Sequence, residues 1–226
     1  PYAFLDDAPL EERRTQAVQS RRYGGPDSAG DLGRLDAAAI AAVREEAWPQ
    51  VRGADEMHQA LTGLGALTAA EAARNDGWPQ WLRALADDGR ATALAVHDDG
   101  TRLWVATESL PQLRALYPHA DAQPDVAVPA ECLRVDWSRE SALRELLRSR
   151  LTALGPTPAA EIAAALALEP REVEAALLAL QSEGFVMQGR FTPGTPVDEW
   201  CERHLLARIH RYTLRRLRRE IEPVAP

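Results

Sequence analysis

The sequence predicts a mainly α-helical protein with a small β component. Apolar residues recur at helical spacing through most of the 226 residues, and short apolar segments flank turn-forming residues at two places. The hydrophobic fraction of 46% and the charged fraction of 27% are typical of a chain that folds around a core. We expect a helical domain with a β-hairpin over residues 1–130, a helical module with a second hairpin over 135–195, and a long basic helix over 196–226.

Most of residues 1–130 predict helices with clear start and stop signals. Asp6 and Asp7 are cap candidates for a first helix, which Gly24-Gly25-Pro26 ends. Asp36 caps a second helix, which ends at Trp48-Pro49. Apolar spacing predicts further short helices over about 55–64, from Thr68, and from Trp78 through Leu85.

A β-hairpin follows these helices. Residues 91–97 and 101–107 flank Asp98-Asp99-Gly100, which is a hairpin signal with a glycine-containing loop. A short helix is expected over 110–116. Residues 118–129 are polar and interrupted by prolines, which is typical of a linker, so we place the internal boundary there.

Three helices and a short hairpin are predicted beyond this linker. Ser138 caps the first helix, Thr157 caps the second, and Glu169-Pro170 starts the third. The hairpin is expected to have Phe185-Val186-Met187 and Arg190-Phe191 on either side of a turn at Gln188-Gly189. Three helices and a hairpin within about 55 residues indicate a winged helix.

The third of these helices does not favour sequence-specific reading of duplex DNA. It carries Arg171 but also Glu172, Glu174 and Glu183. The phosphates that flank the major groove repel an acidic helix. We therefore expect this module to serve as a scaffold or a partner-docking unit.

A long amphipathic helix is expected over residues 197–221. One face holds apolar residues such as Leu206, Ile209 and Leu217. The opposite face carries an arginine stripe, made of Arg208, Arg211, Arg215, Arg218 and Arg219. Such a stripe can be a solvated helix face or a track for phosphates, and both readings stay open.

Two tryptophans are candidates for contact with nucleic acid. Trp48 and Trp78 each lie next to a proline at a helix end, where an indole ring can be exposed. An unpaired base that stacks on such a ring gains about 1–3 kcal/mol. The alternative for both residues is packing in the core.

The composition excludes several kinds of chemistry. All 26 basic residues are arginines, so the chain has neither the lysine of a Walker A phosphate loop nor an amine for Schiff-base catalysis. Its cysteines and histidines lack metal-ligand spacing, and we find no nucleophile or acid–base set. We expect no catalytic centre, cofactor or metal in this chain. The net charge of −8 opposes general affinity for nucleic acid, although a local cluster can dominate within a groove.

The ends and the hydropathy of the chain suggest where it works. No apolar run approaches the roughly 20 residues of a membrane helix, and no signal peptide opens the chain. We expect a soluble cytoplasmic protein without a membrane partner. A start at Pro1 without methionine suggests a piece of a longer polypeptide.

Several segments resemble one family in a single order along the chain. Residues 1–14 (PYAFLDDAPLEERR) resemble a segment that follows the second motor domain of the large helicase-related (Lhr) proteins. Later parts of the same region are similar to REEAWP at 44–49, LWVATE at 103–108, GRFTPG at 189–194, EWCER at 199–203 and IHRYTLRRLRREIEP at 209–223.

This resemblance implies a role that the spacing of residues does not show. Lhr proteins are superfamily 2 ATP-dependent helicases that resemble 3′→5′ translocases, unwind DNA and RNA:DNA duplexes and are linked to DNA repair. Their two RecA-like motor domains, which bind ATP and Mg, are followed by a winged helix and a family-specific domain. The chain would be this accessory region, and a tryptophan of the region is thought to stack on the tracking strand, with Trp48 as first candidate and Trp78 as second.

Three roles follow as hypotheses. In the first, the chain guides single-stranded DNA or an RNA:DNA duplex with the face of Arg208, Arg211, Arg215 and Arg218 and with one tryptophan. In the second, it is a winged-helix regulatory or protein-docking module without direct strand contact. In the third, the same arginines form ion pairs with the motor domains of the same polypeptide.

Overall fold

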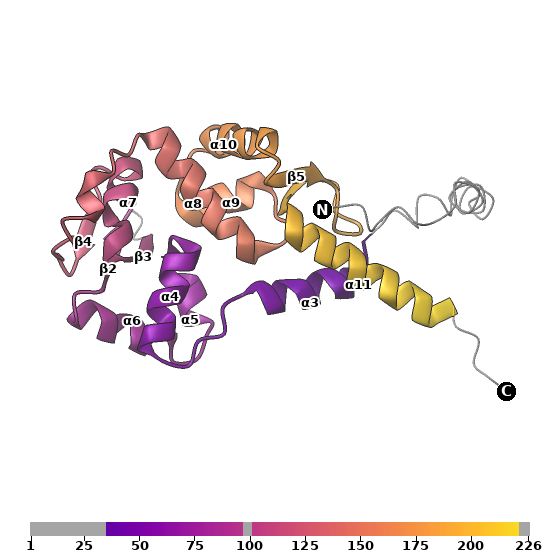
Figure 1. Cartoon of the computed structure of the whole chain (residues 1–226), viewed down its shortest axis with the longest axis horizontal. Coiled ribbons are helices and arrows are strands. Elements are labelled where there is room, and N and C mark those ends of the chain that lie inside the picture. The colour runs from indigo at the N-terminus through magenta and orange to yellow at the C-terminus, as the bar shows by residue number, and fades with distance from the viewer. Residues whose placement is uncertain (1–34, 97–100, 222–226) are drawn as a thin grey trace, which may run out of the picture.

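The computed structural model describes residues 35–96 and 101–221, with side chains as far as Arg218 (Figure 1). The first predicted helix, the turn at Asp98-Asp99-Gly100 and the side chain of Arg219 lie outside the described residues. The fold is mainly α-helical with a small antiparallel sheet, as the sequence predicts. None of the helices within the described ranges has an apolar stretch that could cross a membrane.

The helices of the first half begin and end close to the predicted positions. They are α3 (Ala37–Ala47), α4 (Ala54–Leu64), α5 (Ala69–Ala73), α6 (Trp78–Asp87) and α7 (Leu110–Leu116). The Asp36 carboxylate accepts a hydrogen bond from the Ala39 amide at 2.8 Å and caps α3. Thr68 and Glu71 form a capping box at α5, with each side chain accepting from the other residue's amide.

The predicted hairpin is the centre of a sheet with the strand order β1-β3-β2-β4. The strands are β1 (Leu67–Thr68), β2 (Ala91–Ala95), β3 (Arg102–Ala106) and β4 (Asp121–Gln123). The pairing of β2 with β3 is antiparallel and confirms the hairpin. The two outer strands were not predicted, because each has only two or three residues and depends on a partner strand far along the chain.

The segment over 118–129 therefore is more than a linker. β4 lies in it and pairs with β2, and the Thr92 hydroxyl donates to the Pro124 carbonyl at 2.6 Å. The largest core cluster joins Leu94 and Leu103 of the sheet to Leu146 of the following helix and to residues beyond it. The core thus continues across the expected boundary, and the division into 1–130, 135–195 and 196–226 stays a prediction.

Three helices follow, namely α8 (Arg139–Leu154), α9 (Ala159–Leu166) and α10 (Pro170–Ser182). Ser138 caps α8 as predicted. The prediction that Thr157 caps α9 is wrong, because Pro158 takes the cap position. Thr157 instead exchanges backbone hydrogen bonds of 2.9 and 2.8 Å with Trp200 and forms an isolated β-bridge.

The predicted turn at Gln188-Gly189 is also wrong. Strand β5 (Val186–Gly189) runs through these residues and pairs with β6 (Glu199–Glu202), so that residues 190–198 form the connecting loop, which we call the wing loop. The aromatic ring of Phe191 covers Gly189, and a Cβ atom there would lie 2.9 Å from the ring. Gly189 is required by this close approach rather than by a turn.

The last helix, α11 (Arg203–Ile221), starts later than the predicted residue 197, because β6 precedes it. Two buried carboxylates define this boundary. Glu199 accepts hydrogen bonds from the amides of Phe191 and Thr192 in the wing loop, at 3.0 and 2.7 Å. Glu202 accepts from the amides of His204 and Leu205, both at 2.9 Å, and so caps the first turn of α11.

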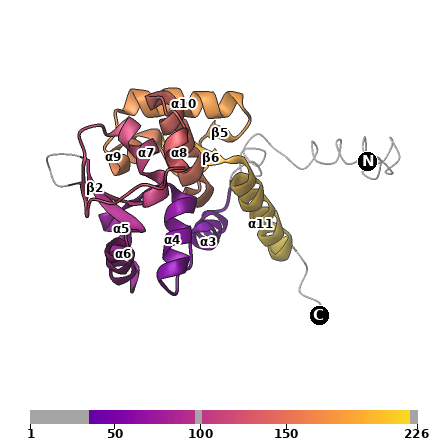
Figure 2. The ribbon, with the colours of Figure 1, turned by 60° about the vertical axis from the view of Figure 1, so that its left-hand side comes forward.

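Helices α3 and α11 lie side by side and form an arm at one side of the molecule (Figures 1 and 2). They are antiparallel, since Asp36 at the start of α3 contacts Thr213 and Arg216, whereas Glu46 near its end contacts Arg208. A separate core cluster, which includes Ile40, Val43, Leu205 and Ile209, holds the two helices together.

Candidate nucleic-acid interface

The buried face of α11 packs against α3. Leu205, Ile209 and Thr213 are buried, and the Thr213 hydroxyl accepts a hydrogen bond from the Asp36 amide at 3.0 Å. Leu206 and Leu217 are half-buried beside them. This is the amphipathic arrangement that the sequence predicts, with the apolar side toward a neighbouring helix.

The arginine stripe divides into two parts in the structure. Arg211, Arg215 and Arg218 are exposed, and none of them has a hydrogen bond or ion pair to a residue in the described ranges. We call these three residues the exposed arginine row. Arg208 instead pairs with Glu46 at 2.5 Å, so it stabilises the arm and has less freedom to bind a ligand.

The exposed arginine row has the chemistry of an anion-binding surface. With a rise of about 1.5 Å per residue, Arg211 and Arg215 are about 6 Å apart along the axis, and Arg218 lies about 4.5 Å further. From Arg203 to Arg218 the sequence of α11 contains no acidic residue. Guanidinium groups bind phosphate oxygens in a bidentate manner, so a chain of phosphates is the matching ligand.

The two candidate tryptophans contact each other. Trp48 follows α3 and Trp78 begins α6, and their rings stack with centroids 6.0 Å apart and planes 10° apart. Trp78 is only 3% exposed, so its ring belongs to the core and offers no face to a base. Trp48 is half-buried against the same cluster and keeps part of its surface accessible.

The structure does not bring Trp48 and the exposed arginine row together. Trp48 follows the end of α3 at which Glu46 pairs with Arg208. The row extends in the opposite direction, past Arg216 and its partner Asp36 at 3.3 Å. A strand that contacts both would have to follow the length of the arm.

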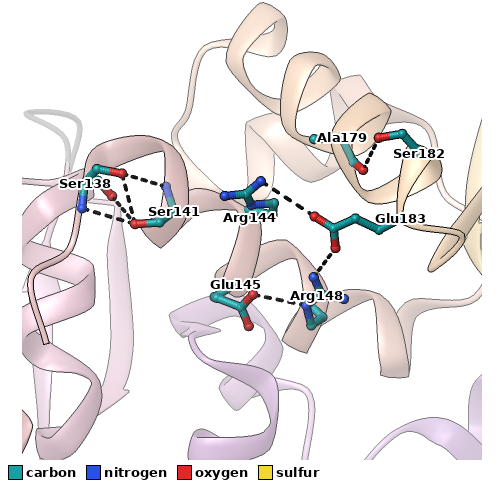
Figure 3. Close-up of polar contacts among 8 residues, drawn as sticks. All are labelled: Ser138, Ser141, Arg144, Glu145, Arg148, Ala179, Ser182 and Glu183. Carbon is teal, nitrogen blue, oxygen red and sulfur yellow. Dashed lines mark hydrogen bonds and ion pairs between the residues drawn. The ribbon is translucent and has the colours of Figure 1, made fainter.

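Glu172 of α10 and Glu183, the residue that follows this helix, are paired with arginines of α8. Glu172 receives two hydrogen bonds of 2.8 Å from Arg139. At the other end of α10, Glu183 lies 3.6 Å from Arg144 and 2.5 Å from Arg148, and these side chains point toward one another in Figure 3.

These contacts fix α10 on α8 at both ends. The hydrogen bond from Arg139 holds the pKa of Glu172 below its usual value, so this carboxylate stays charged in mildly acidic solution. Arg171 and Glu174 remain on the exposed side of α10 and balance each other. The helix therefore presents no excess of positive charge to DNA.

Within the described ranges no three histidine, cysteine, aspartate or glutamate residues are placed to hold a metal ion. Burial raises the pKa of the Cys201 thiol to about 12, so this cysteine is not a thiolate nucleophile at neutral pH.

The sequence did not indicate several residues of the contact between α3 and α11. Glu46 and Tyr212 hydrogen-bond to each other at 3.0 Å, and Arg216 reaches Asp36, but each pair is separated by more than 160 residues in the sequence. Local periodicity carries no signal for such contacts. These residues meet because α3 and α11 pack in an antiparallel manner.

Comparisons with known proteins were made for the whole chain. No protein-family model matches it. The chain is 27% identical, over 235 aligned residues that include 99% of it, to a curated protein of Mycolicibacterium smegmatis described as "Lhr helicase/ probable uracil glycosylase". The alignment spans only 15% of the length of that relative. The chain is therefore similar to one region of an Lhr-like helicase.

Proposed function

We propose that this chain is a non-motor accessory region of a cytoplasmic Lhr-type ATP-dependent helicase and guides single-stranded nucleic acid along α11. The observation that carries the proposal is the exposed arginine row, Arg211, Arg215 and Arg218, which has no acidic partner in the described ranges. The likeness to a region of an Lhr helicase supports a nucleic-acid ligand. ATP and Mg would bind to motor domains of the parent polypeptide, and the chain itself contributes no catalytic centre.

We also propose that α8, α9, α10, β5 and β6 form a winged helix. The order of the elements supports this assignment, and so does the bridge of Thr157 to Trp200, which adds a short third strand position beside β6. In this arrangement the wing loop leads through β6 into α11. Nucleic acid would then lie along the arm instead of along α10, whose charges are already balanced.

The salt dependence of binding tests the strand-guiding role. Each phosphate neutralised in a single strand contributes about −0.7 to the slope of log K against log salt concentration, so the three arginines together contribute about −2. In the combined Arg211→Gln, Arg215→Gln and Arg218→Gln variant, we expect the slope of log K against log salt concentration to be less negative by about 2. The measurement is fluorescence anisotropy of a labelled single-stranded oligonucleotide, titrated with the chain at several salt concentrations.

A matched variant controls for the change in net charge. Arg74, Arg83 and Arg102 are exposed, and their replacement by Gln removes the same charge elsewhere, since they lie at the end of α5, on α6 and on β3. This variant should keep the slope of the parent chain. An equal loss of slope in both variants, or no binding by the parent, would contradict strand guiding by α11. The arginines would then be better assigned to ion pairs with the motor domains.

A second candidate function rests on α10. Its exposed side has balanced charge, and Leu178 is 54% exposed there, which suits contact with another protein better than contact with DNA. We propose a regulatory or protein-docking role as the alternative. Co-purification with the motor domains that is lost in Leu178→Ser but kept in the triple arginine variant would favour this role.

A further inference from the structure

A groove of about 400 Å³ lies between the wing loop and the first half of α11. Its apolar lining residues are Leu35, which precedes α3, Met187 of β5, Phe191 of the wing loop, and Leu206 and Ala207 of α11. Arg203 and His210, both exposed, are its polar lining residues. We call this the wing groove; β5 and the start of α11 lie next to each other in both views of the molecule (Figures 1 and 2).

The apolar walls are open to solvent and held in place. On β5, Val186 is buried whereas Met187 is 48% exposed, because neighbouring side chains of a strand alternate between faces. The Phe191 ring rests on Gly189, and the Phe191 amide donates to the buried carboxylate of Glu199 at 3.0 Å. The aromatic wall is therefore positioned before any ligand arrives.

The wing groove continues directly into the exposed arginine row. Arg203, Ala207, Arg211 and Arg215 follow one another at intervals of four residues and so lie along one side of α11. A ligand that covers this side meets an apolar, partly aromatic surface first and guanidinium groups next. An unpaired nucleotide combines these two properties, since its base has an apolar face and its phosphate is an anion.

We propose that the wing groove binds an unpaired base of the strand whose phosphates lie on the exposed arginine row. The proposal rests on the function proposed above and adds a base-binding site to it. The groove volume falls in the range of small-molecule sites, about 300–1,000 Å³, and suits a single base. Five of the seven lining side chains are apolar, and only Arg203 and His210 could hydrogen-bond to a base, so binding is expected to tolerate different bases.

The test separates the contribution of bases from that of phosphates. The probes are a labelled oligodeoxythymidine and an oligonucleotide of equal length in which abasic spacers replace the thymidines. The Kd for the abasic oligonucleotide divided by the Kd for oligodeoxythymidine gives the contribution of the bases to affinity, and we call this quotient the ratio. Ala207 is exposed, so Ala207→Phe fills the groove without disturbing the core. We expect this variant to lower the ratio by about fivefold or more while the salt slope stays unchanged.

Two further variants keep the test decisive. Met187→Gln makes one exposed wall polar and should also lower the ratio. Ala84→Phe adds the same ring to an exposed position of α6 and should leave the ratio as it is in the parent.

The possible failures are distinguishable. An unchanged ratio in both Ala207→Phe and Met187→Gln, with the salt slope of the parent retained, would overturn the base site and leave strand guiding intact. If the parent chain shows no salt-dependent binding, both the base site and strand guiding by α11 are contradicted. A change of oligomeric state in Ala207→Phe with an unchanged ratio would assign the groove to a second copy of the chain and overturn the base site.

Discussion

At the scale of single residues, Arg150 and Glu71 form an ion pair within the folded chain. Arg150 of α8 is 2% exposed, and its guanidinium donates to the Ala66 carbonyl at 2.9 Å and to both carboxylate oxygens of Glu71. Its Nε atom has no hydrogen-bond partner in the described ranges. Among residues 35–96 and 101–218, Glu71 is the countercharge that pairs with this buried cation.

The charge of Glu71 is stabilised in spite of its burial. Burial raises the pKa of this carboxyl group, but the hydrogen bond and the charge of Arg150, together with hydrogen bonds from Thr68, outweigh it and lower the pKa below its usual value. A carboxyl group with a lowered pKa in the folded state adds stability at pH values above its unfolded pKa.

Replacement of Glu71 by Gln is expected to lower the free energy of unfolding by about 3–5 kcal/mol, because Arg150 is left as an uncompensated buried charge. Gln keeps an oxygen that can accept from the Thr68 amide, so the cap of α5 is retained. Urea unfolding monitored by circular dichroism measures the difference.

The pH dependence provides a second readout of the same pair. The contribution of Glu71 is fully present above its unfolded pKa of about 4.3 and is lost as the pH falls through the lower folded pKa. The difference in the free energy of unfolding between the parent and the Glu71→Gln variant should thus become smaller below about pH 4.3. Glu45→Gln, at an exposed position of α3, serves as the control. A difference that does not change between neutral and acidic pH would show that the ionised pair is not its source.

At the scale of elements, the boundary between β6 and α11 depends on Glu202. Its side chain is 5% exposed and accepts from the amides of His204 and Leu205 and from the His204 ring. These contacts satisfy amides in the first turn of the helix, which would otherwise lack partners.

Glu202→Ala is expected to destabilise the chain by about 1–2 kcal/mol, since two amides at the start of α11 lose their acceptor. Thermal unfolding measures the effect. Glu174→Ala, on the exposed side of α10, should change stability by less than about 0.5 kcal/mol. Equal effects of the two replacements would argue against capping by Glu202.

Elements with local signals could be predicted from the sequence, and those that depend on distant partners could not. Asp36 and Ser138 mark helix starts because a cap acts within three residues of itself. By contrast, the sequence EWCE of β6 resembles the start of an amphipathic helix. It is a strand because Gln188 of β5 pairs with Trp200. In addition, the carboxylates of Glu199 and Glu202 accept hydrogen bonds from backbone amides of the wing loop and of α11.

At the scale of the whole molecule, the largest core cluster of the described residues extends across the boundary that the proline-rich segment suggests. Leu143, Leu146 and Leu151 of α8 belong to the same buried cluster as Leu94 and Leu103 of the sheet. The pair of Arg150 and Glu71 crosses the same boundary. Each half therefore buries apolar surface that only the other half can cover.

We expect the chain to unfold in one cooperative transition. Tryptophan fluorescence and far-ultraviolet circular dichroism should give coincident urea transitions, because the tryptophans lie in both halves and report on one unit. Two separated transitions would instead support the division at residues 130–135 and would contradict a shared core.

The candidate site shows the same limit of sequence analysis. Helical spacing was enough to place Arg211, Arg215 and Arg218 on one face, and the structure leaves all three exposed. Spacing could not reveal that Arg208 is paired with Glu46 or that Trp78 is buried, because both facts depend on packing between distant segments. The wing groove likewise exists only because the wing loop returns to α11.

The antiparallel arm also determines how the described chain would respond to force. Its first residues and the second half of α11 are adjacent, since the Asp36 amide lies 3.0 Å from the Thr213 hydroxyl. Tension applied at these two places would peel α3 from α11 one contact at a time, first at Asp36 and later at Glu46. Arg44 of α3 also donates to the Leu154 carbonyl at the end of α8, so this contact would break in the same process. The sheet takes no part in these contacts and would be loaded only after the arm had opened.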